Sequence, residues 1–333
     1  MKRRTFIAGS ATLLAMPSIV VRAQGRKPTK RLAMVRPSGP VSIMTVNGDP
    51  SYRPFFDELG RHGYVEGQNL IVVRFSAEGH QDRYGAVVQQ AIDSAPDVIF
   101  FTSATMLATI RPSIPVVLNS SDPIAWGFTT SLARPSGNIT GTTNDSGLEI
   151  WGKRLSILRE AAGSLKKPYF LALHFMWENR VGQAVRQAAE QLGLSLTPAI
   201  LPVDLSEDAY APVFEEMKAS GADGLVVDPT SENYTYHQTI TALAARHRLP
   251  AIYNTRGFVV GGGLLAYGAT KDFLERFPIM AGQIAKIFDG AKPADIPYQQ
   301  PTNWELIANV KAAQAIGLTL PSSLLSQANE VIE

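Results

Sequence analysis

The chain has 333 residues, of which 45% are hydrophobic and 18% are charged. This composition excludes an intrinsically disordered protein, and the length is typical of two domains. Because the chain has no cysteine, disulfides, thiolate metal sites, a cysteine nucleophile and a thioether-linked lipid anchor are excluded as well. Residues 1–23 hold four of the 31 basic residues and none of the 29 acidic ones, so the remainder has a net charge of −2. Such a body has no electrostatic field suited to nucleic acid, and we expect no nucleic-acid partner.

Residues 1–23 are predicted to be a cleaved signal peptide. They combine a basic start, an apolar run over residues 6–21 and a small residue, Ala23, at the expected cleavage position. The apolar run contains glycine, serine and proline, which makes it too weak to span a bilayer stably. The pair Arg3-Arg4, followed by Thr-Phe-Ile, resembles a twin-arginine export signal, and an ordinary secretory signal is the alternative. Either route predicts a mature protein in the periplasm, without a lipid anchor and without stable membrane insertion.

Behind this leader, short apolar runs alternate with amphipathic helical patterns. Strands are predicted at residues 32–35, 70–75, 98–101, 115–118 and 139–142, and then at 169–173, 196–201, 224–227, 251–253 and 264–267. Between them, apolar residues recur at helical spacing, as Tyr84, Val87, Val88 and Ala91 do. This alternation is typical of parallel sheets covered by helices on both faces.

The two series of strands predict an α/β fold of two doubly wound parallel-sheet lobes. Turn-forming residues cluster at 133–138, which is the expected linker between the series. The last third of the chain departs from simple alternation, with a helix that carries Phe277 and Ile284 on one stripe, a proline-rich loop, a strand at 306–310 and a short helix. Since such a tail can return to the first lobe, we predict a hinge with several crossovers, an N-terminal lobe of residues 30–140 plus roughly 269–300, and a C-terminal lobe of residues 141–268 plus part of 301–333.

The sequence contains no pattern typical of a catalytic or cofactor site. No serine has glycine two residues away on both sides, the phosphate-binding loop is missing, and the glycines at 261–263 lack the spacing of a dinucleotide fingerprint. The five histidines include no H-E-x-x-H motif and no pair four residues apart. We therefore expect no enzymatic activity, no cofactor and no metal site.

Ligands of parallel α/β sheets bind beyond the carboxyl ends of the strands. Applied to both lobes, this rule selects mostly polar loop tips and predicts a ligand-binding site made of Ser38, Thr102, Ser103, Ala104, Asn119, Ser120, Asp122, Trp177, Asp228, Thr230, Tyr253 and Asn254. Their hydroxyl, amide and carboxylate groups suit a small polar or zwitterionic molecule. The same residue types also cap helices, and a tryptophan beside a loop is often a packing residue. Capping and packing are therefore the alternative roles at each position.

A series of short motifs runs along the body of the chain: FDELG at 56–60, GYVEGQN at 63–69, SLARP at 131–135, GNITG at 137–141, GKRL at 152–155, LPAIY at 249–253, GGLLAYG at 262–268, GAKPADIP at 290–297, GLTLP at 317–321 and ANEVI at 328–332. This series resembles the ABC transporter substrate-binding protein family with the type 1 periplasmic-binding-protein fold. Each motif is common alone, but their order from about residue 30 to the C-terminus is specific. The chain departs from the family pattern at Ser103, where relatives often have proline, and at Asp272, which is displaced from the usual position of an acid after Tyr-Gly-Pro.

The resemblance implies a non-catalytic receptor that closes its two lobes on a small molecule. It implies an amino-acid-like or aromatic ligand, as in some relatives, and transient binding to an inner-membrane ABC permease. One alternative is a periplasmic sensor that delivers its ligand to a receptor kinase. A less favoured alternative is an exported α/β enzyme.

Overall fold

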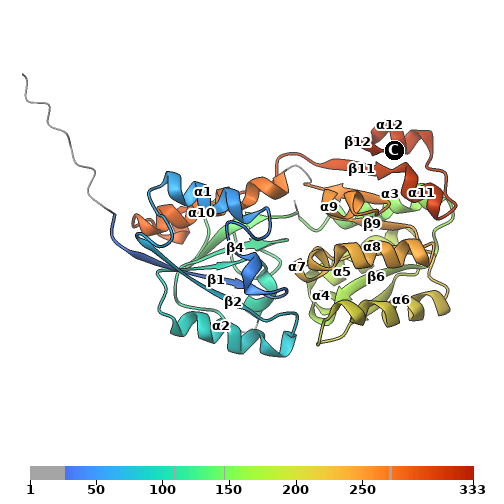
Figure 1. Cartoon of the computed structure of the whole chain (residues 1–333). Coiled ribbons are helices and arrows are strands. Elements are labelled where there is room, and N and C mark those ends of the chain that lie inside the picture. Colours follow the sequence, from blue (N-terminus) through green and yellow to red (C-terminus); the bar gives the residue numbers. More distant parts are fainter. Residues whose placement is uncertain (1–26, 109, 146, 270–271) are drawn as a thin grey trace, which may run out of the picture.

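The computed structural model describes residues 27–333 apart from 109, 146, 270 and 271, and it forms two lobes side by side (Figure 1). The predicted signal peptide lies outside the described residues. The N-terminal lobe contains a five-stranded parallel sheet in the order β2-β1-β3-β4-β5. Its strands are β1 (Lys30–Arg36), β2 (Leu70–Ser76), β3 (Val98–Phe101), β4 (Val116–Ser120) and β5 (Ile139–Thr143). All four residues of β3 are buried, because helices cover both faces of the sheet.

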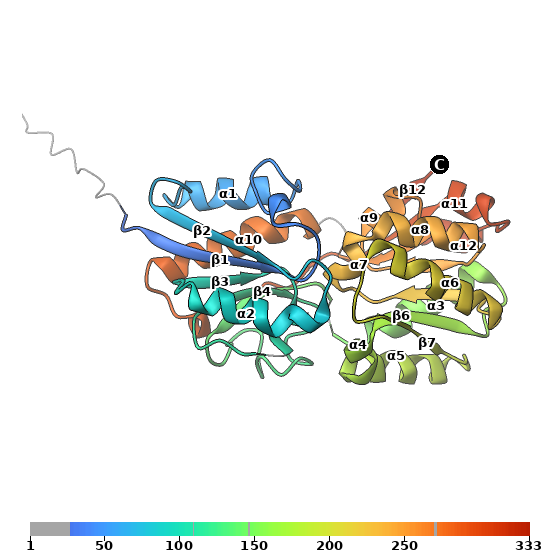
Figure 2. The same ribbon diagram turned by 60° about the horizontal axis from the view of Figure 1, so that its bottom comes forward.

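The two faces of this sheet have separate cores. Alternate residues of β1 point to opposite faces, so Leu32 belongs to one core and Ala33 to the other. Helices α1 (Tyr52–Arg61) and α10 (Asp272–Phe288) cover the first face, and α2 (Tyr84–Asp93) covers the second (Figure 2). Short 3-10 turns complete the lobe: η1 (Val41–Ile43), η2 (Gln81–Arg83), η3 (Ala104–Ala108) and η5 (Pro293–Asp295).

The C-terminal lobe has a seven-stranded sheet in the order β12-β11-β10-β9-β8-β6-β7. Its strands are β6 (Pro168–Leu173), β7 (Thr197–Leu201), β8 (Gly224–Val227), β9 (Ala251–Tyr253), β10 (Leu265–Gly268), β11 (Glu305–Asn309) and β12 (Glu330–Ile332). Its helices are α3 (Ile150–Ala162), α4 (His174–Glu178), α5 (Arg180–Gln191), η4 (Glu207–Ala209), α6 (Tyr210–Ala219), α7 (Ser231–Thr235), α8 (His237–Arg246), α9 (Arg256–Val260), α11 (Val310–Ala315) and α12 (Ser322–Gln327). One continuous apolar core joins these elements.

The predicted class of two doubly wound α/β lobes is confirmed, with one exception in the sheet. Strand β11 runs antiparallel to β10, because it enters the sheet from the tail and not from a helical crossover. The short terminal helix expected from the sequence is followed by β12, which pairs with β11 in parallel.

The linker prediction at residues 133–138 is wrong. Strand β5 follows this segment and still pairs with β4 in the N-terminal sheet, so the chain leaves the lobe only after Thr143. It returns after β10 to form α10, and it crosses again between η5 and β11 (Figure 1). The cluster of turn residues is thus a loop within one lobe, since turn chemistry alone does not distinguish the two cases.

A buried ion pair fixes the first crossover to the C-terminal lobe. Arg154 of α3 donates from Nη2 to Asp145 Oδ1 over 2.8 Å and from Nε to the carbonyl of Tyr267 over 2.9 Å. The two charged side chains are only 1% and 4% exposed. The guanidinium also lies 4.8 Å from the Trp151 ring.

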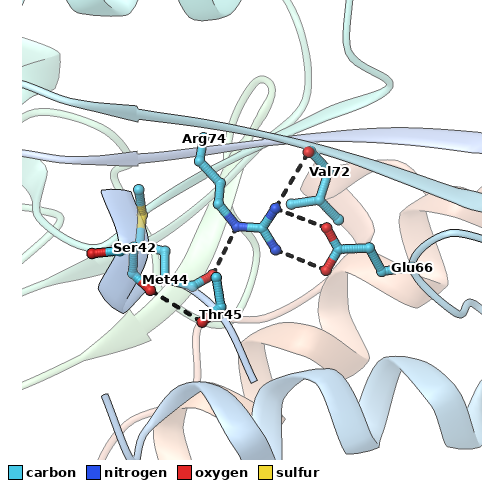
Figure 3. Close-up of polar contacts among 6 residues, drawn as sticks. All are labelled: Ser42, Met44, Thr45, Glu66, Val72 and Arg74. Carbon is cyan, nitrogen blue, oxygen red and sulfur yellow. Dashed lines mark hydrogen bonds and ion pairs between the residues drawn. The ribbon is translucent and has the colours of Figure 1, made fainter. Parts of the chain in front are cut away.

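Arg74 of β2 anchors the loop that follows η1 (Figure 3). Its guanidinium donates to both carboxylate oxygens of Glu66 over 2.7 Å, and its Nε donates to the carbonyl of Met44 over 2.8 Å. Within the same loop, the Thr45 hydroxyl donates to the carbonyl of Ser42 over 3.0 Å. This anchoring matters for the site, because the loop leads directly to Asp49.

Candidate functional site

A cavity lies between the two lobes, at the carboxyl ends of their parallel strands. It occupies about 830 Å³, including the part that is open to solvent. The N-terminal lobe and the first crossover contribute Arg36, Asp49, Ser51, Tyr52, Thr102, Ser103, Ala104, Thr105, Asn119, Ser120, Ser121, Trp126, Asn144 and Phe277. The C-terminal lobe contributes Met176, Pro229, Thr230, Ser231, Tyr234, Thr235, Asn254 and Thr255.

Two charged side chains are found among the residues that line this cavity. Arg36, at the end of β1, is 8% exposed, and its Nε donates to the carbonyl of Ser38. No carboxylate forms an ion pair with Arg36 within the described part of the chain. Asp49 is half-buried, and its Oδ1 accepts a hydrogen bond of 2.9 Å from the backbone N–H of Ser51. The lining therefore offers one cationic and one anionic group to a ligand.

Aromatic rings form much of the apolar lining. Tyr52 and Phe277 meet edge to face, with their ring centroids 5.2 Å apart. Burial raises the pKa of Tyr52 to about 12, against the opposing effect of the Arg36 charge, so its hydroxyl stays protonated. Trp126 donates from Nε1 to the Ser121 hydroxyl over 3.3 Å. The cavity can thus bind an aromatic or aliphatic group beside the two charged side chains.

Three hydroxyl groups that line the cavity have no hydrogen-bond partner among the residues that the structure describes. They belong to Thr102, Ser120 and Thr255, and Ser120 and Thr255 are 2% and 4% exposed. Buried hydroxyl groups normally form hydrogen bonds, and an unpaired one costs about 1–3 kcal/mol. These groups come from both lobes and are available to a bound molecule.

Seven of the twelve predicted site residues line the cavity. They are Thr102, Ser103, Ala104, Asn119, Ser120, Thr230 and Asn254. They follow or end strands β3, β4, β8 and β9, so the carboxyl-end rule brings them together across the two lobes.

Asp122 and Trp177 lie outside the lining. The Asp122 carboxylate accepts hydrogen bonds from the backbone N–H groups of Ile124 and Ala125, over 2.9 and 3.0 Å, and so caps a turn. Trp177 packs under the guanidinium of Arg186, 4.2 Å from the ring centroid. These are the capping and packing roles that compete with ligand binding.

Asp228, Tyr253 and Ser38 also lie outside the lining. Asp228 is fully buried and accepts hydrogen bonds from the Leu173 N–H, over 3.1 Å, and from the side chains and backbone of the following turn. Burial raises the pKa of Asp228, and these donors oppose the rise. Tyr253 stacks on Phe258, with ring centroids 4.5 Å apart. The Ser38 hydroxyl lies 2.8 Å from Thr235 Oγ1 of the other lobe.

Several lining residues were not selected from the sequence. Asp49, Ser51 and Tyr52 precede or begin α1, and Tyr234 lies within α7. The carboxyl-end rule does not reach them, because they are several residues beyond a strand. Phe277 lies 176 residues after the end of β3 and comes to the cavity only because α10 returns to the first lobe.

Backbone hydrogen bonds join two further loops of the two lobes. The Leu205 N–H donates to the Gly79 carbonyl over 3.2 Å, and the Gln81 N–H donates to the Val203 carbonyl over 3.1 Å. Between these bonds, His80 Nδ1 lies 2.6 Å from Asp204 Oδ1. We call residues 79–81 with 203–205 the interlobe clasp. The clasp and the contact of Ser38 with Thr235 both join segments of the two lobes outside the crossovers, so the structure is that of a closed form.

The family model for ABC transporter substrate binding proteins matches residues 46–332. The chain belongs to this family. A curated relative, the tyrosine-binding protein of Clostridioides difficile, is 20% identical over 288 residues, which cover 81% of this chain and 77% of the relative. The predicted family membership is confirmed, and the chain is an ABC transporter substrate-binding protein.

Solved structures share the fold at low sequence identity. A conserved domain protein from Vibrio cholerae is 18% identical, with a TM-score of 0.75 over 91% of this chain and 99% of its own. An ABC domain from Streptococcus pneumoniae in complex with L-Trp is 21% identical, with a TM-score of 0.73 over 91% of this chain and 100% of its own. Within residues 27–333, outside the gaps, no helix is long and apolar enough to cross a membrane. In the same described part, no group of three or more His, Asp and Glu side chains is placed to hold a metal ion.

Proposed function

We propose that this protein is the periplasmic receptor of an ABC importer, that it closes on a free amino acid, and that it presents the closed form to an inner-membrane permease. The single observation that carries the ligand class is the presence of one cationic side chain, Arg36, and one anionic side chain, Asp49, in a cavity otherwise lined by neutral groups. A zwitterion supplies the carboxylate and the ammonium group that these two side chains lack.

Arg36 is the proposed partner of the ligand carboxylate. Its guanidinium is almost fully buried, and the attraction of an anion offsets the cost of desolvating it. Asp49 is the proposed partner of the ammonium group. The Arg74 anchor supports this role, because it fixes the loop that carries Asp49.

The unpartnered hydroxyls support binding by both lobes together. Ser120 belongs to the N-terminal lobe and Thr255 to the C-terminal lobe, so a ligand that bonds to both favours the closed form over the open one. The aromatic lining around Tyr52 and Trp126 favours an aromatic side chain. The relatives described above as tyrosine-binding and as a complex with L-Trp agree with this preference.

The proposed periplasmic location and the proposed permease partner have separate support. The predicted signal peptide at residues 1–23 supports a periplasmic location, and the substrate-binding family supports a permease partner and the absence of catalysis. Binding without turnover is therefore the expected behaviour.

The test is a thermal-shift and calorimetric screen of the mature protein against L-amino acids, aromatic acids, nucleosides and sugars. A ligand at 100 times its Kd adds about 2.7 kcal/mol to the free energy of unfolding, which raises Tm measurably. We expect an aromatic L-amino acid to give the largest shift and to be recovered unchanged. A sugar or nucleoside that binds while every amino acid fails would overturn the proposed ligand class.

Variants locate the charged contacts. R36Q should weaken amino-acid binding roughly 10- to 150-fold, because a hydrogen bond to a charged group contributes about 1.5–3 kcal/mol. D49N should weaken binding of the zwitterion, whereas D57N, on the exposed side of α1, should leave the Kd unchanged. Equal affinities of D49N and D57N for the amino acid would contradict the role of Asp49.

A further inference from the structure

A buried glutamate of one lobe receives hydrogen bonds from the other lobe. Glu232 lies in α7 of the C-terminal lobe and is 0% exposed. Its Oε1 accepts a hydrogen bond of 2.6 Å from Tyr84 Oη of α2 and one of 3.0 Å from Thr105 Oγ1 of η3. Both donors belong to the N-terminal lobe, so these bonds exist only while the lobes are together.

The surroundings of Glu232 are neutral or acidic. The Ser231 hydroxyl donates to Glu232 Oε2 over 3.2 Å, and the backbone N–H of Glu232 donates to the same carboxyl group. The charge of Asp228 disfavours ionisation of Glu232, and Tyr210 of α6 interacts with both acids. Among the residues that the structure describes, no Lys, Arg or His forms an ion pair with Glu232. An isolated ionised carboxylate is costly to remove from water, and its neutral form is much less so.

Opening the lobes ends both the burial of Glu232 and its hydrogen bonds from the N-terminal lobe. Separation removes the Tyr84 and Thr105 hydroxyl groups from Glu232 Oε1 and admits water to the carboxyl group. The open form therefore favours the ionised state, while the closed form surrounds the same group with protein and with a second acid, Asp228.

We propose that Glu232 is a proton-linked latch: its carboxyl group takes up one proton as the lobes close and releases it as they open. This inference rests on the proposed function, because closure is the step that binds the ligand. Tyr84 and Thr105 both donate to Oε1, which leaves Oε2 for the proton. The Ser231 hydroxyl donates to Oε2 over 3.2 Å when the carboxyl group is ionised, and it turns to accept the proton when the group is neutral. Burial raises the pKa of Glu232 and outweighs the donors that lower it.

The proton uptake on closure determines how ligand affinity depends on pH. The pKa of the carboxyl group is near its ordinary value in the open form and higher in the closed form. Ligand affinity is therefore highest at low pH, falls about tenfold per pH unit as pH rises between the two pKa values, and is constant above the closed-form pKa.

The closed form can be held without a ligand. Ser38 Oγ and Thr235 Oγ1 lie 2.8 Å apart across the lobes, and the chain has no cysteine of its own, so S38C/T235C provides one reversible cross-link. The readout is the infrared C=O stretch of a protonated carboxyl group, titrated from pH 4 to 9 in the oxidised and the reduced protein. E232Q identifies the band of Glu232, and E216Q, an exposed glutamate of the same lobe, is the matched control.

We expect a band that titrates at higher pH in the oxidised protein than in the reduced one, that is missing in E232Q and that persists in E216Q. A band assigned to Glu232 that titrates over the same pH range in both forms would overturn the latch.

Calorimetry without the cross-link gives an independent answer, with L-tryptophan as the first probe. Its Kd should rise with pH in the wild type and in E216Q but not in E232Q, and a pH-independent Kd in the wild type would also overturn the latch. If L-tryptophan and the other amino acids fail to bind while the infrared result holds, the proposed ligand class fails and the latch stands.

Discussion

Gly79 offers a direct test of the closed form, because it lies where the two lobes touch. Its φ is +93°, and a Cβ atom added to it would lie well inside van der Waals contact of the Leu205 carbonyl oxygen of the other lobe. In G79A this backbone oxygen must move away, so the interlobe clasp cannot form as it does in the wild type. The open form has no such conflict, since Leu205 is then distant.

The expected size of the effect follows from the clasp. It contains two backbone hydrogen bonds, from Leu205 N–H to Gly79 and from Gln81 N–H to Val203. At about 0.5–1.5 kcal/mol each, their loss weakens ligand binding by roughly 5- to 150-fold. The left-handed backbone adds a cost of about 1–2 kcal/mol to folding itself, which must be separated from the effect on closure.

A control variant at Gly67 separates the cost of backbone strain from the effect on lobe closure. The φ of Gly67 is +80°, and a Cβ atom there would meet nothing within 4 Å, so G67A carries the backbone strain without an interlobe conflict. Calorimetry with the tightest-binding amino acid of the screen should give a weaker Kd for G79A and an unchanged Kd for G67A. Urea unfolding without ligand should show similar destabilisation in both. If G79A binds as tightly as G67A, the clasp does not contribute to ligand binding.

Three further predictions concern stability and the hinge. D228A should lower the free energy of unfolding by roughly 2–4 kcal/mol in ligand-free urea melts, because four buried donors lose their acceptor. An unchanged midpoint would contradict this structural role. R154A leaves the buried Asp145 carboxylate unpaired and should lower the free energy of unfolding by about 3–5 kcal/mol. The double variant R154A/D145A should recover most of this loss, because it also removes the unpaired charge. R74A should release the loop before Asp49, because Arg74 no longer bonds to Met44 and Glu66. Hydrogen exchange should then show faster amide exchange at residues 44–51 than in the wild type. Equal protection in both proteins would show that Arg74 does not hold the loop.

Local sequence patterns were sufficient for every described strand except β12, and for seven of the residues that line the cavity. Apolar runs such as residues 98–101 are buried on both faces, so their composition alone indicates a central parallel strand. Once the strands are known, their carboxyl ends select the polar tips, and Ser103 and Asn254 line the cavity as that rule predicts.

Other site residues depend on contacts that no local pattern contains. Asp49 lines the cavity because Arg74, 25 residues later, anchors its loop, and Phe277 does so because α10 returns across the hinge. Asp228 has the residue type and position of a ligand-binding group, but the donors around it are all internal to its lobe. Whether a polar residue after a strand faces a ligand or a helix end is decided by its neighbours in space.

The sequence by itself determined the two-lobed α/β class and the family, because hydrophobic periodicity and short motifs are properties of adjacent residues. Only the tertiary structure decided where the chain changes lobe, since the turn residues at 133–138 look the same in a loop as in a linker. It also decided which residues of one lobe meet the other. Tyr84 and Glu232 are 148 positions apart, and their hydrogen bond depends on the packing of two separately formed cores.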